Sequence, residues 1–334
     1  MARLRRSGGQ SAASEDSSLR IRAAWLYYNQ GLTQKQVSER LGISRGTAIR
    51  VLGEALERGD VQIWINENEA ECAELAVRLE TAFSLDEAVV VPSPGGEAAS
   101  KAVGLALGKL LSEAVTDNMT IGVGWGRTLT ASLASLRPVR RDGVKVVSLL
   151  GGVVEARGSN PLEYSWRMAS QFGADCYLFI APAFVDSVAT KRRLIEKCGL
   201  DKLYALAQKL DLAVVSAGDI NLRSTSLAAG LLAPGELEEL VELGAVCDVL
   251  CNFLDDEGKS VPHALNRRAM SVELDDLRNA RHVVIATGGA HRVAAIRAAI
   301  RRIGCNTLVT DEAAARGLLA GESGRRPAAR TFSD

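Results

Sequence analysis

The chain of 334 residues balances 40 Lys and Arg against 40 Asp and Glu, and 47% of its residues are hydrophobic. Zero net charge excludes a general affinity for polyanions, so any contact with nucleic acid has to come from a local basic patch. No apolar run reaches the roughly 20 residues that span a bilayer, so no membrane partner is expected, and the length predicts two domains.

The N-terminal segment, residues 1–18, is expected to be a disordered arm. It combines arginines with Ser, Gly and Ala and lacks the apolar stretch of a signal peptide, so we expect a cytoplasmic protein. A helix is predicted from about Leu19 to Gln30. The apolar face that would help to form a three-helix core consists of Ile21, Ala24, Trp25 and Tyr28.

The next stretch has the pattern of a helix-turn-helix. Thr33 and Gln36 can form a capping box at the start of the first helix, in which each side chain bonds the backbone amide of the other residue. Val37 and Leu41 lie one turn apart on the inner face of this helix. Gly42 follows directly, at the place where a tight turn between two helices needs a positive φ.

The second helix of this pair would be the helix that reads DNA. Ser44 can cap it, and its inner stripe is expected to contain Ala48, Ile49, Leu52 and Leu56. Outer positions near the start of such a helix meet base edges and phosphates. The residues that we expect to contact DNA are Gln34, Lys35, Ser44, Arg45, Thr47 and Arg50.

Two amphipathic helices joined by a glycine turn also occur in helical bundles, so this pattern alone leaves both interpretations open. Residues 1–60 hold ten Lys or Arg against six Asp or Glu, the local basic excess that phosphate contacts require. The alternating run 61–65 predicts a strand where winged helix-turn-helix domains have a wing. Both observations favour a DNA-binding domain over residues 19–66, with operator DNA as its partner.

Residues 67–85 are predicted to form an amphipathic linker helix. After it, short apolar strands alternate with helices, which is typical of an α/β domain with a mainly parallel sheet covered on both faces. The expected strands are 88–91, 119–123, 144–150, 176–180, 212–216, 247–254, 283–286 and 307–309, and the expected helices include 100–115, 129–136, 162–172 and 291–303. This domain is predicted to cover residues 86–320, followed by a disordered tail over 321–334.

Ligands of open α/β sheets bind at the carboxyl ends of strands, and three such ends are rich in glycine. The first, Gly122-Val-Gly-Trp-Gly-Arg-Thr128, could hold an anion with its amides, or its glycines could serve only a tight turn. Gly122 and Gly124 also fit a dinucleotide fingerprint. The next strand ends in Leu149-Leu150-Gly151-Gly152 instead of an acidic residue, so no cofactor is expected.

The second glycine-rich end is Gly151-Gly152, and the third is Gly288-Gly289, which opens a helix that carries Arg292. This guanidinium could bind a phosphate or carboxylate, or it could face solvent. Asp248 interrupts an apolar strand, where an acid is costly unless it forms hydrogen bonds. The expected ligand contacts are Gly122, Gly124, Trp125, Gly126, Arg127, Thr128, Gly151, Gly152, Asn160, Asp248, Gly288, Gly289 and Arg292.

The six cysteines are scattered along the chain, mostly in apolar surroundings. Cys247 and Cys251 are four residues apart, but no Cys or His follows them at a spacing typical of zinc sites. We therefore expect buried, reduced cysteines and no metal site.

The ordered set of motifs resembles the SorC family of bacterial transcriptional regulators. The resemblance extends from about Leu19 to Leu319 and rests on GLTQKQVSERLGISRGTAIRVL, IGVGWGRTL, LLGGVV, PHALNRRAMSVELDDLR, ATGGAHRVAAIRAAI and LVTDEAAARGLL. It implies an operator-binding domain followed by an effector domain similar in fold to ribose-5-phosphate isomerase. It also implies that the loops at Gly122–Thr128 and Gly288-Gly289 line the effector pocket, that the effector is a phosphorylated sugar, and that the protein is a homodimer or homotetramer.

The chain departs from the family pattern at two positions near the expected pocket. Arg292 stands where the family usually has lysine, which keeps the positive charge and makes bidentate binding possible. Cys247 stands where a glycine is usual, which places a larger side chain beside Asp248.

These observations predict a transcriptional regulator of a carbohydrate or polyol operon, switched by a sugar, sugar phosphate or polyol. The alternative is a sugar-phosphate isomerase or deaminase with an attached DNA-binding domain. Such an enzyme needs a base beside the sugar, and the only candidates, Asp248 and His291, have no evident partner in the sequence. We therefore expect no catalytic residues.

Overall fold

The computed structural model describes residues 12–57, 60–61, 67–93, 98–154, 160–221 and 224–322. The chain forms two compact units, Met1–Asn66 and Glu67–Asp334. The division falls where the sequence placed the end of the DNA-binding domain, and the expected linker helix belongs to the second unit.

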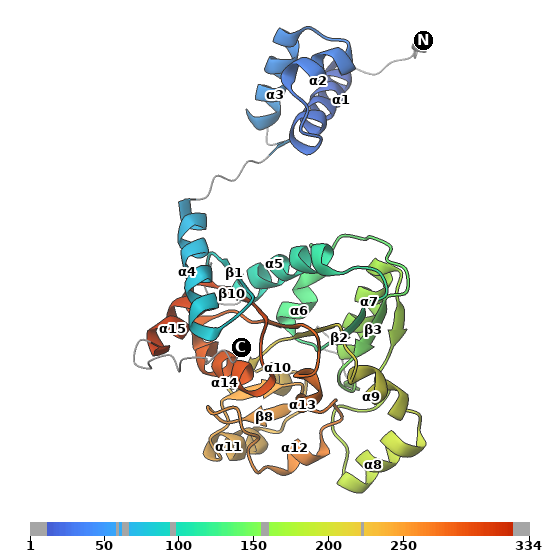
Figure 1. Cartoon of the computed structure of the whole chain (residues 1–334), viewed down its shortest axis with the longest axis vertical. Coiled ribbons are helices and arrows are strands. Elements are labelled where there is room, and N and C mark those ends of the chain that lie inside the picture. The colour runs from blue at the N-terminus through green and yellow to red at the C-terminus, as the bar shows by residue number, and fades with distance from the viewer. Residues whose placement is uncertain are drawn as a thin grey trace, which may run out of the picture. The chain divides into compact units, whose positions relative to one another are not determined.

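The first unit consists of helices: α1 (Ala12–Ala24) continued by the π-helical turn η1 (Trp25–Asn29), then α2 (Gln34–Leu41) and α3 (Arg45–Glu57) (Figure 1). Its core is formed by Ala23, Leu26, Val37, Leu41, Ala48, Val51 and Leu52. Because α1 begins at Ala12, residues 12–18 are helical and do not belong to the predicted arm. The rest of that arm, and residues 62–65 of the predicted wing strand, lie outside the described residues.

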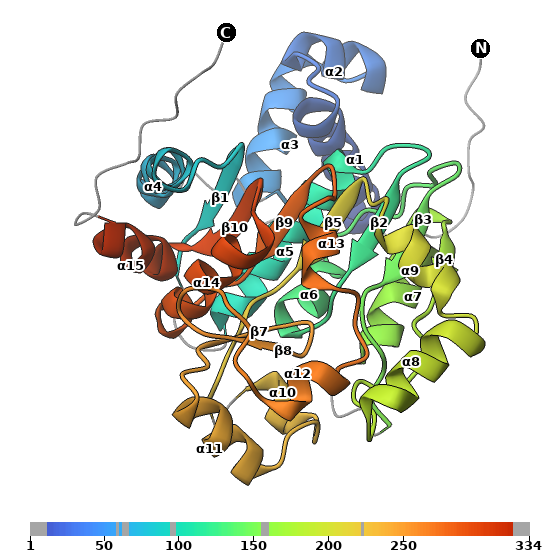
Figure 2. The same cartoon turned by 60° about the horizontal axis from the view of Figure 1, so that its bottom comes forward.

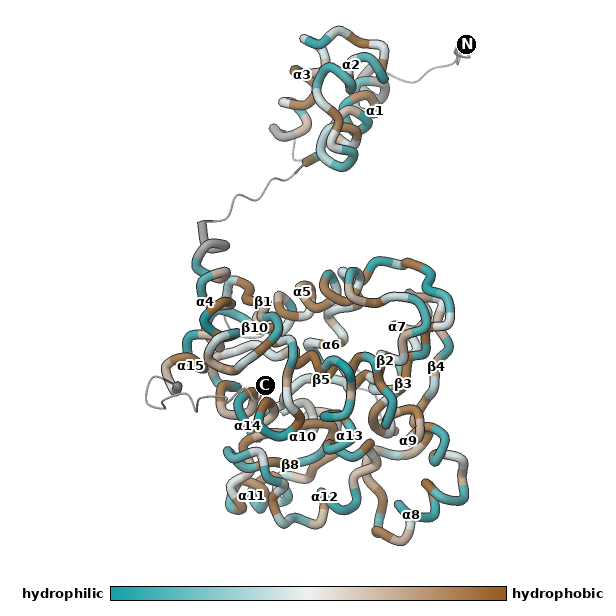
Figure 3. Tube along the Cα trace, in the orientation of Figure 1, coloured by the Kyte–Doolittle hydropathy of each residue, from teal (hydrophilic) through white to brown (hydrophobic). Residues whose placement is uncertain are grey.

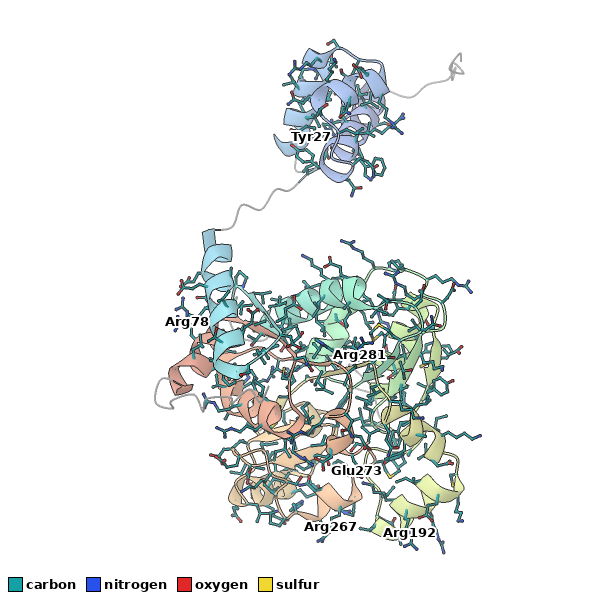
Figure 4. All side chains as sticks on the ribbon, viewed as in Figure 1. Tyr27, Arg78, Arg192, Arg267, Glu273 and Arg281 are labelled. Atoms are coloured by element: carbon teal, nitrogen blue, oxygen red, sulfur yellow. The ribbon has the colours of Figure 1, made fainter. Side chains whose placement is uncertain are left out.

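The inner face of the first helix differs from the prediction. Ile21 and Trp25 are 53% and 54% exposed, whereas Leu26 is buried. The buried face of α1 follows Arg20, Ala23 and Ala24, which leaves Ile21 on the outer side. From Trp25 on the chain forms a π-helical turn, which holds more residues than an α-helical turn and changes the phase of the side chains. Tyr27, labelled in Figure 4, packs against the core, and its ring lies edge to face with that of Tyr28 at a centroid distance of 4.9 Å.

The second unit is an α/β domain whose described residues form a seven-stranded sheet. Its helices are α4 (Glu67–Phe83), α5 (Ala98–Ala114), α6 (Arg127–Ser132), α7 (Pro161–Phe172), α8 (Val188–Lys197), α9 (Asp201–Ala207), α10 (Thr225–Ala228), α11 (Pro234–Glu242), α12 (Ala264–Arg268), α13 (Leu274–Leu277), α14 (Val293–Ile303) after the 3-10 turn η2 (Ala290–Arg292), and α15 (Glu312–Glu322). The large sheet contains β1 (Glu87–Val91), β2 (Thr120–Val123), β3 (Lys145–Ser148), β4 (Asp175–Tyr177), β5 (Leu212–Val215), β9 (Val283–Ala286) and β10 (Thr307–Asp311).

All neighbouring strands of this sheet are parallel, in the order β1-β10-β9-β5-β2-β3-β4. Helices cover both faces (Figures 1 and 2). Because successive side chains of a strand point to opposite faces, Val146 joins the core under α5, α6 and α7, and Val147 joins the core on the other face. The strands are accordingly among the hydrophobic segments in Figure 3. This arrangement confirms the predicted mainly parallel α/β fold.

The prediction of one continuous strand over residues 247–254 is wrong. This segment forms a hairpin of β7 (Cys247–Val249) and β8 (Asn252–Leu254), and β7 also pairs with β6 (Gly218–Asp219) in a separate antiparallel sheet. Leu250 and Cys251 form the turn with φ of 53° and 62°. Two consecutive residues at positive φ are the mark of a tight hairpin turn, which normally uses Asn and Gly. The apolar sequence therefore concealed the turn.

The close contact between α5 and α6 depends on glycines one turn apart on α5. A Cβ on Gly104 would lie 2.5 Å from the carbonyl oxygen of Thr128, and a Cβ on Gly108 would overlap the carbonyl oxygen of Ser132 and the hydroxyl of Ser135. Since these neighbours include backbone of α6, they cannot move without shifting that helix. The glycines thus fix the position of α6, which begins at the carboxyl end of β2.

We expect Gly108→Ala to destabilise the second unit by about 1–3 kcal/mol, the usual cost of overpacking a core. Urea unfolding followed by tryptophan fluorescence would measure the change. Gly235→Ala is the matched control, because a Cβ on this helical glycine of α11 would have no other atom within 4 Å. The control should be neutral or stabilised by up to ~1 kcal/mol. Equal effects of the two substitutions would contradict the packing argument.

Candidate functional site

The helix-turn-helix of α2 and α3 has the local geometry predicted for it. The amide of Thr33 donates to Oε1 of Gln36 at 2.9 Å, and the amide of Gln36 donates to Oγ1 of Thr33 at 3.3 Å, which confirms the capping box. Gly42 ends α2 with a φ of 67°, a left-handed conformation that strains other residues. The amide of Thr47 donates to Oγ of Ser44 at 3.1 Å, so Ser44 caps α3.

The residues expected to contact DNA differ in how freely they can do so. Lys35 and Arg45 are exposed, and neither side chain has a hydrogen bond or ion pair within the described part of the chain. Gln34 is half-buried. The hydroxyls of Ser44 and Thr47 lie 2.9 Å apart, so both are engaged at the start of α3. Ser44 and Thr47 therefore stabilise the start of α3, whereas the side chains of Lys35 and Arg45 are available to a partner.

Arg50 is exposed but lies among acidic side chains. Its guanidinium forms an ion pair with Glu54, one turn later on α3, and lies 4.0 Å from a carboxylate oxygen of Asp16 on α1. A DNA phosphate would have to compete with both carboxylates for this arginine. Arg50 is therefore less available to a partner than an unpaired cation such as Arg45.

Ile49 does not belong to the inner stripe predicted for α3. Its side chain is 47% exposed, while Ala48, Val51 and Leu52 are buried. The buried stripe follows Ala48, Val51, Leu52 and Ala55 at spacings of three and four residues, which leaves Ile49 beside the stripe and outside it. Ile49 instead lies on the outer side of the helix together with Arg45 and Arg50.

The topology of the large sheet singles out one crevice. From β2 the chain runs outward through β3 and β4, and it then crosses back to β5, which pairs with the other edge of β2. The direction of the strand order thus reverses between β2 and β5. Ligands of open α/β sheets bind at such a switch point, outside the carboxyl ends of the strands. The loops that meet there are 124–126 after β2 and 216–217 after β5.

A pocket of about 40 Å³ lies at this switch point. A side-chain hydrogen bond joins its two loops, since Oγ of Ser216 donates to the carbonyl oxygen of Trp125 at 3.0 Å. The lining combines serine hydroxyls and two carboxylates with an apolar wall and consists of Trp125, Gly126, Ser216, Gly218, Asp219, Ser224, Ser226, Asp248 and Leu250. The sequence-predicted residues Trp125, Gly126 and Asp248 are therefore brought together in one cavity.

Arg292 holds one of the two carboxylates. Its Nε donates to Oδ1 of Asp219 at 2.9 Å, and both residues are 8% exposed. Its Nη1 donates to Oγ of Ser100 at 3.1 Å and to the carbonyl oxygen of Gly288 at 3.0 Å. Arg292 is therefore a buried, bonded cation rather than a solvated one. Nε2 of His291, an exposed side chain, lies 3.8 Å from the other oxygen of the same carboxylate.

Asp248 supplies the second carboxylate. Its Oδ1 accepts a hydrogen bond from the amide of Cys251 at 2.8 Å, and its Oδ2 accepts one from the hydroxyl of Ser226. Burial raises the pKa of Asp248 to about 6, and the two hydrogen bonds oppose this rise. The turn of the hairpin thus explains how an acid is tolerated in an apolar segment.

The Gly288-Gly289 loop already binds an anionic group of the chain itself. The amide of Gly289 donates to Oδ1 of Asp311 at 2.8 Å, and Asp311 is fully buried. The same carboxylate accepts hydrogen bonds from the amide of Ala314 at 3.2 Å and from the hydroxyl of Ser93 at 2.7 Å. The Gly289 amide is therefore engaged by an aspartate of the protein, in the way that the sequence predicted for an external anion.

The second glycine-rich end is used for packing within the protein. The amides of Gly151 and Gly152 donate to the carbonyl oxygens of Met270 and Ala181, each at 2.8 Å. A Cβ on Gly151 would lie 2.6 Å from two backbone oxygens, which explains the glycine. Asn160 caps α7, with its Oδ1 accepting from the amide of Leu162 at 3.0 Å. None of these three residues lines the described pocket.

The remaining members of the first loop have separate positions. Gly122 lies inside β2, where a Cβ would meet the side chains of Leu210 and Leu149. Gly124 follows the strand, and a Cβ there would lie 3.0 Å from Leu250 of the pocket wall. In α6, Arg127 is exposed and Thr128 is buried. The glycines at 122 and 124 thus allow close packing beneath the pocket.

Sequence reasoning missed the segment that follows β5. Ser216 and Asp219 line the pocket, as do Ser224 and Ser226. The segment Ser-Ala-Gly-Asp at 216–219 stands at the carboxyl end of a predicted strand, so the argument applied to the glycine-rich loops could have found it. Its signal is a pair of hydroxyl and carboxylate side chains around one glycine, and not a pair of glycines.

A larger cavity of about 440 Å³ lies at the opposite edge of the sheet, where the strands begin. Met119, His282 and Thr307 contribute to it, together with Arg281, which is labelled in Figure 4. Parallel α/β sheets bind their ligands at the carboxyl ends of strands. The smaller pocket lies at that end of the sheet, and the larger cavity does not.

The expectation that the cysteines are buried is correct for three of the six. Cys72, Cys247 and Cys251 are buried, Cys198 is exposed, and the other two are half-buried. Within the described residues, no cluster of three His, Cys, Asp or Glu side chains could hold a metal ion. No described helix combines the length and the apolar character that crossing a membrane requires.

Comparison with known proteins covers both units. Residues 67–320 match the family described as "Putative sugar-binding domain", and residues 14–63 match the family described as "Homeodomain-like domain". The erythritol catabolism regulatory protein EryD of Brucella abortus is 30% identical over 94% of this chain and 100% of its own length. The deoxyribonucleoside regulator of Bacillus subtilis is 30% identical over 91% of this chain and 98% of its own length.

The fold agrees with that of a solved relative. The full-length sorbitol operon regulator SorC of Klebsiella pneumoniae superposes with a TM-score of 0.78 at 28% identity, over 91% of this chain and 99% of the regulator. These relatives regulate transcription and are not enzymes, which removes the isomerase or deaminase alternative. With a helix-turn-helix unit joined to a sugar-binding α/β unit, the chain belongs to the SorC family of sugar-binding transcriptional regulators.

Proposed function

We propose that this protein regulates a carbohydrate or polyol catabolic operon and that a hydroxyl-rich effector binds in the pocket between β2 and β5. The observation that carries the proposal is the pairing of two carboxylates, Asp219 and Asp248, with serine hydroxyls against the Trp125 wall. Carboxylates accept hydrogen bonds from sugar hydroxyls, and an aromatic wall packs against the carbon skeleton. The names of relatives that act in erythritol catabolism and in the sorbitol operon support this class of effector.

The charges of the pocket favour an uncharged effector over the phosphorylated sugar that the family resemblance implied. Asp248, which bonds only a hydroxyl and an amide, would repel a phosphate placed beside it. Arg292 is already bonded to Asp219, and the Gly289 amide is bonded to Asp311. The described lining thus offers a phosphate one uncompensated carboxylate and no unengaged cation. An unphosphorylated polyol would meet hydrogen-bonding groups on several sides.

Effector binding would change the conformation of the second unit. The effector would contact loops 124–126 and 216–217, which the hydrogen bond between Ser216 and Trp125 joins. We propose that the effector has different affinities for two arrangements of these loops. Such differential affinity is the condition for coupling to a second ligand, here operator DNA. We propose that the protein acts on paired half-sites as a homodimer or homotetramer.

A thermal-shift screen of the full chain tests the effector class. The ligands would be matched pairs of polyols or sugars and their monophosphates, with inorganic phosphate alone as a further control. We expect stabilisation by the free member of one pair, amounting to ~2.7 kcal/mol at 100 times Kd. Ser226→Ala should abolish this shift, and Asp256→Asn, which changes an exposed acid outside the pocket, should retain it.

Different outcomes would contradict different parts of the proposal. Stabilisation by a monophosphate alone would disprove the uncharged effector but keep the sensor. No response to any sugar, polyol or phosphate would contradict the sensor itself. Sequence-specific DNA binding is measured separately. Sequences bound by the protein are selected from random DNA, and the affinity of the protein for them is compared with and without the effector. An unchanged affinity would contradict the proposed coupling.

A further inference from the structure

Ile49 is an exposed aliphatic side chain on the outer face of the reading helix. Its 47% exposure contrasts with the burial of Ala48, Val51 and Leu52 around it on α3. It therefore adds little to the core of the first unit. A β-branched residue is also a weaker helix former than alanine or the long polar residues that commonly occupy exposed positions. The stability of the helix thus gives no reason for an isoleucine at this position.

The polar residues beside Ile49 on α3 are engaged within the protein. Thr47 bonds Ser44 at the helix start, and Arg50 pairs with Glu54. Arg45, one turn before Ile49, is exposed and has no partner within the described residues. The unengaged part of the outer face therefore contains one cation and one aliphatic group, four residues apart.

We propose that Ile49 contacts the 5-methyl group of a thymine in the major groove and that it is a specificity-determining residue. This inference rests on the proposed reading of DNA by α3. The thymine methyl is the apolar group that base pairs present in the major groove, and aliphatic side chains recognise it by contact. Cytosine, adenine and guanine offer only hydrogen-bonding groups and ring carbon at that edge.

The spacing on α3 also places the thymine relative to the contact of Arg45. Four residues of α-helix rise about 6 Å, and stacked base pairs are about 3.4 Å apart. The methyl group should therefore lie within roughly two base pairs of the guanine or phosphate that Arg45 contacts. A preference for thymine at one position near that contact is the expected signature.

A double-mutant cycle between protein and DNA tests this contact. Sequences bound by the full-length wild-type protein would be selected from random DNA, and each thymine of the selected site would be replaced in turn by deoxyuridine, which lacks only the methyl group. At one position we expect a roughly four-fold loss of affinity, about the value of one buried methyl group. The Ile49→Ala protein should bind both forms of the site equally, because its side chain no longer reaches the methyl group.

Two controls separate this contact from other effects. Arg45→Ala should weaken binding to the thymine and uracil forms by the same factor, because its interaction does not involve the methyl group. Circular dichroism should show an unchanged fold for Ile49→Ala, whose altered side chain is exposed. An equal penalty for uracil in the wild-type and Ile49→Ala proteins would overturn the contact alone. Failure to enrich any sequence would overturn both the contact and the reading function.

Discussion

Replacing Arg292 with methionine is expected to lower the free energy of unfolding of the second unit by about 3–5 kcal/mol. The substitution keeps most of the side-chain volume but leaves Asp219 buried without the guanidinium that bonds it at 2.9 Å. It also removes the hydrogen bonds to Ser100 and Gly288. The loss would be measured by urea unfolding, monitored by the fluorescence of the buried Trp125.

Arg301→Met is the matched control for this experiment, because Arg301 lies on α14, the helix that follows Arg292. Its ion pair with Glu257 joins more exposed side chains, so the control should cost less than about 1 kcal/mol. Adding Asp219→Asn to Arg292→Met should recover part of the stability, because the uncompensated charge is then removed. An additive double variant would show that the large cost comes from lost packing and not from the buried carboxylate.

This result would change how Arg292 is understood. The sequence suggested a cation that binds the ligand, and the structure shows a cation that orients a carboxylate toward the pocket. The family resemblance implied a lysine at this position, whose single ammonium lacks the planar arrangement of donors. Arginine can bond Asp219, Ser100 and Gly288 at the same time. The substitution therefore bears on the position of Asp219 as much as on local charge.

The elements that could be predicted are those encoded by local patterns. Apolar runs marked the strands of the parallel sheet, because these strands are buried on both faces. Thr33 and Gln36 marked the start of α2, because a capping box is a contact between residues three apart. Each of these signals lies within a few residues of the structure that it specifies, and none depends on distant parts of the chain.

The elements that were missed depend on distant contacts or unusual local chemistry. The turn at Leu250 and Cys251 uses residues that rarely adopt positive φ, so no turn signal was present. The pocket at Asp219 follows from the order of β5 beside β2, which no local pattern contains. The exposure of Ile49 could not be read from spacing alone, since a stripe through Ala48 and Leu52 can include either Ile49 or Val51, and the packing of the unit buries Val51.

The free energy of unfolding of the second unit is expected to fall as the pH rises, because of the buried carboxyl of Asp248. The substitution Asp248→Asn should remove this pH dependence. The folded protein binds the Asp248 proton more tightly than the unfolded chain does, because burial raises the pKa of this carboxyl from 3.8 to about 6. Stability is therefore fully present below the unfolded pKa and falls as the pH rises through the folded one. By pH 7 the loss should reach roughly 2–3 kcal/mol, from 1.36 kcal/mol for each pKa unit.

An asparagine at this position can still accept from the Cys251 amide and can donate to the hydroxyl of Ser226, so the fold should be retained. Thermal unfolding between pH 4 and pH 8 should give similar stabilities at the acid end and a more stable variant at neutral pH. Asp256→Asn, an exposed acid in the following turn, should behave as the wild type. The variant should gain this stability while losing effector affinity, because the ionised carboxylate is the group that accepts hydroxyl hydrogen bonds. Parallel pH profiles for the wild type and Asp248→Asn would show that the pocket carboxylate is not the group that titrates.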